Sequence, residues 1–367
     1  MFPAKSLYGF SRHPIGMESV PGTGGRSRSP TVAPTPSGDR IIRIQHLTKV
    51  FREKKRSVTA VDDVSFDVMS GEIFGLLGPN GAGKSTIIRI LTTLLAPTSG
   101  TAFVDRYEVT KKDEEIRGII GVCPQNSTLD VELTAYDNLE FYGRLLNVNE
   151  GILHDRVMQL LEMVDLTDRA HMPVRTFSGG MRRKLEIVRA FLHRPLILFL
   201  DEPTIGLDPD SRWEVWQQIE RLNAERTTII LTTHYMEEAE KLCHRVAFMD
   251  HGRLIALDTP ENHRRAIPAG DLIEIGFDTL PEGVLPAITA TGLVKQVERR
   301  EKKVRISALN GSKVLPALIA VFERFAVPMT SISIRSPTLE DVFIYLTGRK
   351  LDAGNGEAPS IGGRPKP

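Results

Sequence analysis

Nine residues at positions 78–86, GPNGAGKST, match the spacing GxxxxGK[ST]. The glycines of this segment allow the backbone to curl so that its N–H groups point at a polyphosphate, and the helix expected to follow adds its positive end. Lys84 would bridge the β- and γ-phosphates, and the Ser85 hydroxyl would ligate Mg²⁺. The alternative is a glycine-rich turn that only resembles such a loop. We expect nucleotide contacts from the whole segment: Gly78, Pro79, Asn80, Gly81, Ala82, Gly83, Lys84, Ser85 and Thr86.

Two acidic residues follow a fully apolar run at 196–200, LILFL. Adjacent acids at a strand end face different directions, so Asp201 can orient Mg²⁺ through its water shell while Glu202 polarises the water that attacks the γ-phosphate. An acidic turn that caps a strand is the alternative. His234 ends another run, TTIILTTH, and this strand-end position makes it a catalytic candidate, although a lone histidine is more often structural.

The elements that must position these residues follow from the hydrophobic periodicity. Residues 41–47 and 61–68 alternate like half-buried antiparallel strands, whereas 72–78, EIFGLLG, is nearly continuously apolar, which favours a central strand. Helical patterns occupy about 132–192, before the LILFL run. Strands that alternate with helices predict a parallel α/β sheet, and the candidate residues fall at its strand ends.

Composition limits the classes of function. The 367 residues can hold one large α/β domain with a smaller appendage, or two ordinary domains. Lys+Arg 47 against Asp+Glu 46 leaves a net charge of +1, which argues against a nucleic-acid partner. Cys123 and Cys243 are expected to be ordinary buried thiols. No stretch reaches the roughly 18 apolar residues of a spanning helix, so any membrane span must come from another chain.

A second glycine motif, FSGGM at 177–181, leads into the helical pattern MRRKLEIVRAF. Ser178 can cap that helix, and Gly179 and Gly180 line its N-terminus, which makes a second anion site; a helix cap alone is the alternative. Two half-sites for phosphate in one chain suggest that two copies meet head to tail, each placing its Ser178 segment against the other's Lys84 loop. The basic run RRK at 182–184 is expected to be a solvated helix face.

With these motifs in this order, residues 41–255 resemble the ATP-binding subunits of ATP-binding-cassette (ABC) transporters. The resemblance implies an α/β P-loop NTPase fold with a mixed-sheet core, an antiparallel β subdomain and a helical subdomain. It also implies ATP hydrolysis with Mg²⁺, and ATP held between two subunits. Phe177 and Met181 replace the family's commoner leucine and glutamine, but the serine and the glycines between them are intact.

Three further positions are assigned by the resemblance. Gln125, in VCPQNSTL, is similar to the family's glutamine loop, which reaches the Mg²⁺ and the attacking water and abuts the surface where the membrane partner docks. Asp208, in GLDP, resembles the loop that crosses the dimer interface and links the two sites. Phe51 falls where the family places an aromatic ring to stack on adenine, with a strand-end phenylalanine packed in the core as the alternative.

The chain is expected to divide into four parts. Proline and glycine crowd both ends, which favours disordered tails. The last helix of the C-terminal unit should begin at a Thr338 cap, bury Leu339, Val342, Phe343 and Leu346, and end at Gly348. The expected divisions are a tail at 1–39, the ATPase domain at 40–258 with its helical subdomain at about 126–190, a C-terminal α+β domain at 259–350, and a tail at 351–367.

The C-terminal unit resembles that of daunorubicin-resistance-type exporter ATPases, so the leading interpretation is the ATPase of an exporter. It implies a homodimer or a pair with a similar subunit, a separate integral membrane permease subunit, and a place at the cytoplasmic face of the cell membrane. Drug, lipid, glycan and ion all stay open as cargo. The alternative is a soluble cassette ATPase that acts on ribosomes or DNA, which is disfavoured because the chain has one phosphate loop and only 117 positions between Lys84 and Asp201.

Overall fold

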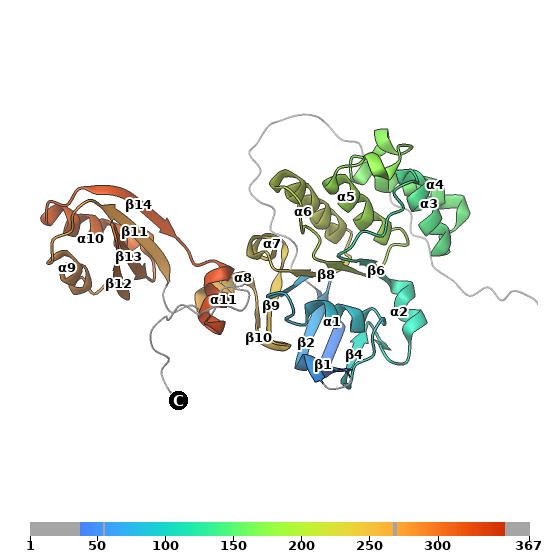
Figure 1. The fold of residues 1–367 in the computed structure, drawn as a ribbon, viewed down its shortest axis with the longest axis horizontal. Coiled ribbons are helices and arrows are strands. Elements are labelled where there is room, and N and C mark those ends of the chain that lie inside the picture. The colour runs from blue at the N-terminus through green and yellow to red at the C-terminus, as the bar shows by residue number, and fades with distance from the viewer. Residues whose placement is uncertain (1–36, 54–55, 267–269, 349–367) are drawn as a thin grey trace, which may run out of the picture. The chain divides into compact units, whose positions relative to one another are not determined.

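The computed structural model describes residues 37–53, 56–266 and 270–348. The tail expected at 351–367 lies outside these ranges, as does the tail expected at 1–39 apart from residues 37–39, which open the first strand. Within the described ranges there are three sheets, coloured blue to red along the chain in Figure 1.

The central sheet has six strands in the order β10-β9-β3-β8-β7-β6. The five strands from β9 to β6 are parallel, and β10 pairs antiparallel with β9 at one edge. The expected parallel sheet is therefore confirmed, with one antiparallel edge strand. Their bounds are β3 Ile73–Leu77, β6 Ile120–Cys123, β7 Ile197–Asp201, β8 Thr228–Thr233, β9 Arg245–Asp250 and β10 Arg253–Asp258.

Both faces of this sheet are buried because alternate side chains of each strand enter different cores. On β7, for example, Leu198 and Leu200 join one core while Ile197 and Phe199 join the other. Helices α5 (Gly179–Ala190) and α6 (Pro209–Ala224) cover the first face, and α1 (Lys84–Leu91) lies on the second (Figure 1). This two-sided burial explains why the LILFL run is continuously apolar.

A second sheet is antiparallel, with the order β2-β1-β4-β5. The two alternating segments predicted as antiparallel strands pair with each other over almost their whole length. Helix α2 (Asp113–Ile119) follows this sheet and leads into β6. The strand bounds are β1 Ser37–Glu53, β2 Arg56–Ser70, β4 Ser99–Val104 and β5 Tyr107–Glu108.

The helical pattern predicted at 132–192 forms three α-helices: α3 (Ala135–Leu145), α4 (Glu150–Met163) and α5. Two short 3₁₀ turns, Thr167–Arg169 and Val174–Thr176, connect α4 to α5. Each α-helix starts at a polar cap, because the first N–H groups of a helix lack partners inside it. The caps are Thr134, Asn149 and Ser178.

A third sheet, β12-β13-β11-β14, lies in the C-terminal part of the chain and is antiparallel throughout. Helices α9 (Val284–Ala290) and α10 (Gly311–Arg324) share its core. Strand β12 and helix α9 were not predicted from the sequence. The strand bounds are β11 Asp271–Phe277, β12 Gln296–Arg300, β13 Lys303–Ala308 and β14 Met329–Arg335.

The last helix, α11 (Leu339–Thr347), starts in a capping box between Thr338 and Asp341 and ends at Gly348, as expected. It packs against α7 (Met236–Leu242) and α8 (Pro260–Ala266) rather than on the third sheet. Its buried residues belong to the core on the α5–α6 side of the central sheet, and the Phe343 ring lies 5.8 Å from that of Phe248. Leu346 is 37% exposed, so its predicted burial is wrong.

Within the residues that the structure describes, no helix is both long and apolar enough to cross a bilayer.

Candidate active site

The glycine-rich loop connects β3 to α1, as the motif requires, so the helix N-terminus lies directly behind it. Gly83 caps α1 with φ +101°, and a Cβ there would lie 2.3 Å from the Ala60 carbonyl oxygen. Only glycine satisfies both conditions. A Cβ on Gly78 would similarly lie 2.2 Å from the Met249 carbonyl oxygen. The loop is therefore held against two neighbouring backbones, which fixes the direction of its N–H groups.

Lys84 is the first residue of α1 and is only 5% exposed. Its Nζ donates to the carbonyl oxygens of Gly78 at 2.5 Å and Pro79 at 3.2 Å, and lies 3.6 Å from Glu202 Oε1. Burial lowers the pKa of Lys84, and the charges of Glu202 and Asp201 oppose that shift. The ammonium is thus folded back on the carbonyl oxygens of its own loop.

Asp201 ends β7, and its Oδ1 accepts hydrogen bonds from two hydroxyls. Ser85 Oγ donates at 3.0 Å and Thr232 Oγ1, on the neighbouring strand β8, at 2.5 Å. Hard oxygen donors from a hydroxyl and a carboxylate, placed beside a phosphate loop, suit Mg²⁺, which retains several waters and needs few protein ligands. Among the described residues no cluster of three or more His, Cys, Asp or Glu could hold a metal by itself.

Glu202 is 6% exposed and lies between two basic groups, Lys84 and His234. His234 Nδ1 lies 2.5 Å from Glu202 Oε2. Burial raises the pKa of Glu202, but the hydrogen bond with His234 and the charge of Lys84 outweigh it, so the net pKa is below the usual value. The carboxylate is thus kept ionised, which is the form that a general base requires.

These groups meet because β3, β8 and β7 are neighbours in a parallel sheet and all end at the same edge. An open cavity of about 400 Å³ lies there, in the size range of ligand pockets. Gln125 lines it, and its side chain is exposed. Phe51 is not in the lining; it is 40% exposed at the end of β1, with Lys49 Nζ 5.3 Å from its ring centre. The lining residues are Ala60, Asn80, Gly81, Ala82, Gly83, Lys84, Ser85, Thr86, Gln125 and Glu202.

The second glycine motif lies apart from the lining of this cavity. Ser178 caps α5 by accepting a hydrogen bond from Met181 N at 3.2 Å, and Ser178 and Gly179 are exposed. A Cβ on Gly180 would lie 2.5 Å from Ser211 Oγ, so this position needs glycine for close packing on α6. Asp208 caps α6 through Ser211 N at 3.0 Å, and that hydrogen bond lowers its pKa.

The basic run at 182–184 is not a solvated face, so that expectation is wrong. Arg183 is 7% exposed and Lys184 8%. Arg183 donates to the carbonyl oxygens of Pro203 and Pro124, which adjoin Glu202 and Gln125. Lys184 pairs with Glu214 at 2.9 Å. The charge of these residues suggested that they are exposed to solvent, because the sequence alone does not show which face of α5 packs on the sheet. The sequence held one partial signal of a role in the site: these residues lie one turn beyond Ser178 of the second glycine motif.

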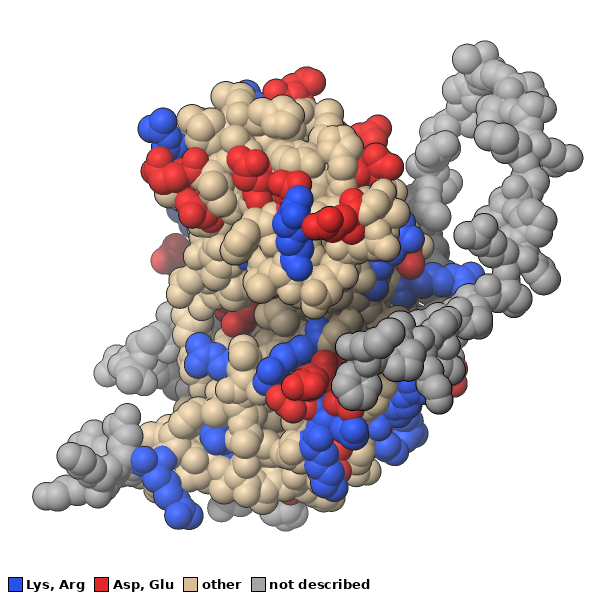
Figure 2. All heavy atoms as spheres, turned by 90° about the vertical axis from the view of Figure 1, so that its right-hand side faces the viewer, with Lys and Arg blue, Asp and Glu red and all other residues tan. Residues whose placement is uncertain are grey.

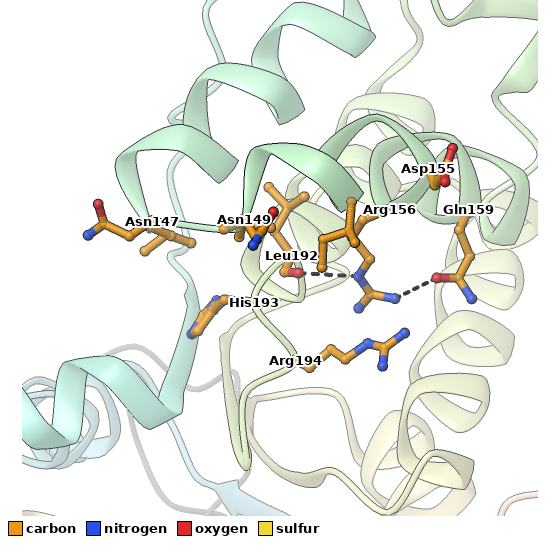
Figure 3. Close-up of a pocket in the computed structure, with 11 residues that line it drawn as sticks. Asn147, Asn149, Asp155, Arg156, Gln159, Leu192, His193 and Arg194 are labelled. Carbon is orange, nitrogen blue, oxygen red and sulfur yellow. Dashed lines mark hydrogen bonds between the residues drawn. The ribbon is translucent and has the colours of Figure 1, made fainter. Parts of the chain in front are cut away.

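A larger hollow, about 740 Å³, lies between the α3–α4 connection and the loop after α5 (Figure 3). Its central cation, Arg156, already donates to Leu192 O at 3.2 Å, Phe191 O at 2.9 Å and Gln159 Oε1 at 2.9 Å. These contacts hold the guanidinium of Arg156 against the loop that follows α5. On the face drawn in Figure 2, acidic and basic side chains are both present, and no single sign covers it.

A strand–loop–helix that carries GxxxxGK[ST], with acids at the end of a parallel strand, defines a P-loop NTPase. The family model described as ABC transporter matches residues 61–205. The linearmycin resistance ATP-binding protein LnrL of Bacillus subtilis is 37% identical over 85% of this chain and 99% of its own length. The Nod factor export ATP-binding protein I of Ralstonia nicotianae is 37% identical over 88% and 97%. This chain belongs to the ATP-binding subunits of ABC transporters.

Solved structures agree with this assignment. An ATP-binding cassette captured as a dimer after hydrolysis, with ADP and Pi, is 25% identical and covers 59% of this chain and 98% of its own, with a TM-score of 0.55. The CbiO1 subunit of Clostridium perfringens is 26% identical over 62% and 92%, with a TM-score of 0.57. The expected fold class and family are confirmed: the chain is an ATPase of the ABC type. Of the proteins named here, one is described as a Nod factor export protein and one as part of an ABC transporter complex, and none is described as acting on ribosomes or DNA.

Proposed function

We propose that this chain is the ATP-hydrolysing subunit of an exporter, that it works as a pair of copies, and that it drives a separate integral membrane subunit. The observation that carries the proposal is the meeting of Lys84, Asp201, Glu202 and His234 at one edge of the sheet. Relatives named for drug resistance and for Nod factor export favour export over import.

In the proposed reaction, the N–H groups of residues 78–86 surround the phosphates of ATP, and Lys84 leaves its loop carbonyls to contact the β- and γ-phosphates. Glu202 accepts a proton from the attacking water, because its depressed pKa keeps it ionised. His234 holds the carboxylate in place through the 2.5 Å contact. Gln125, at the open side of the cavity, is positioned to contact the same water.

The residues present fit a Mg²⁺ ion. Ser85 Oγ and Asp201 Oδ1, which lie 3.0 Å apart, would hold it, with Gln125 as a further oxygen ligand. When bound, the ion would neutralise charge on the β- and γ-phosphates. The hydrogen bond from Thr232 to Asp201 fixes the direction of the carboxylate in advance.

We propose the pairing of two copies because the second glycine motif does not line the Lys84 cavity of its own copy. The lining of the Lys84 cavity includes none of Ser178, Gly179, Gly180 or Asp208, although Ser178 and Gly179 present an exposed helix N-terminus suited to phosphate. A second copy in head-to-tail orientation would bring that helix end to the open side of the cavity. The solved cassette captured as a dimer supports the pairing of two copies. Phe51 remains the proposed stacking surface for adenine.

We place the pair at the cytoplasmic face of the cell membrane, bound to its permease. The test is purification of the full-length chain in mild detergent from membranes of its own cells. The proposal predicts co-purification of an integral membrane protein whose presence raises the rate of ATP hydrolysis. Recovery with ribosomes or DNA instead, with hydrolysis stimulated by them, would replace it with the soluble alternative.

A further inference from the structure

One face of α5 carries three buried charged residues, Arg183, Glu186 and Arg189. None of them lines the Lys84 cavity. We refer to these three residues as the α5 stripe. They recur every three residues and so follow one another along the helix. Their exposed fractions are 7%, 3% and 7%. Because a buried charge is costly without partners, the partners of the stripe indicate its role.

Arg183 binds the backbone that carries the two candidate acids. Its Nε donates to Pro203 O at 2.7 Å, and its Nη2 donates to Asp201 O at 3.0 Å and Glu202 O at 3.2 Å. Glu202 has φ +49°, a conformation that residues other than glycine adopt only when the surroundings impose it. Arg183 is one of the groups that impose it, so it helps to set the direction of the Glu202 carboxylate.

The stripe also holds both ends of the loop that carries Gln125. Arg183 Nη1 donates to Pro124 O at 2.7 Å, immediately before Gln125. At the other end, Thr128 N donates to Glu186 Oε1 at 3.0 Å, and Arg189 donates to Thr128 O at 2.8 Å and to its Oγ1. Gln125 itself stays exposed between these anchors. One helix face therefore fixes both the acid-bearing turn and the glutamine loop.

The same helix begins at Ser178, the residue assigned above to the partner copy's nucleotide. We propose that the α5 stripe couples the two ATP sites of the dimer: it transmits the position of the Ser178 end of α5 to Glu202 and Gln125 of its own chain. This inference rests on the proposed function, because it requires ATP between two copies. The stripe residues lie outside the lining of the cavity at Lys84, so they are positioning residues.

Arginine is required at 183 by its geometry. Its planar guanidinium directs five N–H donors along fixed directions, and here it serves four carbonyls and the Glu186 carboxylate, whose Oε2 lies 3.1 Å from Nη1. Lysine keeps the charge but offers three donors from one atom. Arg183→Lys should therefore retain the buried ion pair with Glu186 while releasing most of the carbonyls.

The test compares Arg183→Lys with the wild type in the full-length chain, measuring kcat, the Kd for ATP and the Hill coefficient of hydrolysis. We expect kcat to fall about 10- to 100-fold, since small misplacements of reacting groups cost this much. We expect an unchanged Kd for ATP, because no stripe residue lines the cavity at Lys84. The Hill coefficient should fall towards one as coupling between the sites is lost.

Arg182→Lys is the matched control. Arg182 lies on the same helix and also donates to two carbonyls, Val174 O at 3.3 Å and Arg175 O at 2.9 Å, both outside the site. It should behave as wild type in all three measurements. If Arg183→Lys yields too little folded protein, Glu186→Gln, which removes the charge that faces Arg183, must show the same fall in kcat and Hill coefficient at unchanged Kd.

The proposal is overturned if both stripe variants keep the wild-type kcat and Hill coefficient, or if kcat and ATP affinity fall together with the thermal midpoint. Glu202→Gln separates this inference from the proposed function. If Glu202→Gln is inactive while the stripe variants are fully active, the inference about the α5 stripe is refuted and the proposed function stands. If Glu202→Gln hydrolyses ATP at the wild-type rate, the proposed function is refuted.

Discussion

His234 Nδ1 lies 2.5 Å from Glu202 Oε2, although 32 positions separate the two residues in the chain. They meet because β7 and β8 are neighbouring parallel strands that end at the same edge. Lys84 lies 3.6 Å from the other oxygen of the same carboxylate. One carboxylate is thus held from both sides.

Replacing His234 should affect turnover and leave binding intact. His234→Ala removes the partner of Glu202 Oε2, so the carboxylate loses its fixed direction. We predict a fall in kcat of about 100-fold, the lower range for loss of effective acid–base catalysis, with an unchanged Kd for ATP. Steady-state kinetics and titration with a fluorescent ATP analogue measure the two quantities. A Kd that rises as much as kcat falls would assign His234 to binding instead.

Glu238 should make stability depend on pH. It is fully buried, accepts hydrogen bonds from Thr204 Oγ1 at 2.8 Å and Trp216 Nε1 at 3.0 Å, and burial raises its pKa. An acid with a raised folded pKa contributes stability below its unfolded pKa, and this contribution is lost as pH rises through the folded pKa. Glutamine does not ionise, so the stability of Glu238→Gln does not fall in this way as pH rises.

The stability of Glu238→Gln relative to the wild type should therefore increase from pH 5 to pH 8. Urea unfolding of both proteins at the two pH values measures the difference. A constant difference would mean that Glu238 has the same pKa in the folded and unfolded chains.

Phe343 should contribute to the stability of the ATPase core despite its distance in sequence. Its side chain is fully buried against Phe248. Phe343→Ala should lower the free energy of unfolding by about 3–5 kcal/mol, as for other buried phenylalanines. Tyr345→Ala, on the same helix but 57% exposed, is the control and should change it by less than about 0.5 kcal/mol. Equal effects of the two substitutions would place α11 off the core.

The phosphate loop and the strand-end acids could be predicted because short stretches of sequence determine their positions. A motif of nine residues between a strand and a helix fixes its own backbone, and neighbouring parallel strands bring their ends together. Lys84, Ser85, Asp201, Glu202 and His234 were found in this way. Their roles in catalysis remain predictions, as do the assigned domain boundaries.

Arg183 and α11 could not be predicted, because both depend on long-range packing. A basic run predicts solvent exposure unless one knows that α5 lies over the ends of β6 and β7, where carbonyl oxygens need donors. Likewise, the apolar face of α11 predicted burial without indicating its partner, which proved to be α7 and α8. Strand β12 was missed because its sequence, QVERR, is mostly charged, as is common at sheet edges.

The central claim is that ATP is bound between two copies, by Lys84 of one and Ser178 of the other. The most direct test is the molar mass of full-length Glu202→Gln, by light scattering, with and without ATP and Mg²⁺. The account predicts the mass of one chain without nucleotide and of two chains with it, and predicts that adding Ser178→Arg keeps the ATP-bound protein at one. A single-chain mass for Glu202→Gln with ATP demonstrably bound, or a two-chain mass that survives Ser178→Arg, would contradict the account.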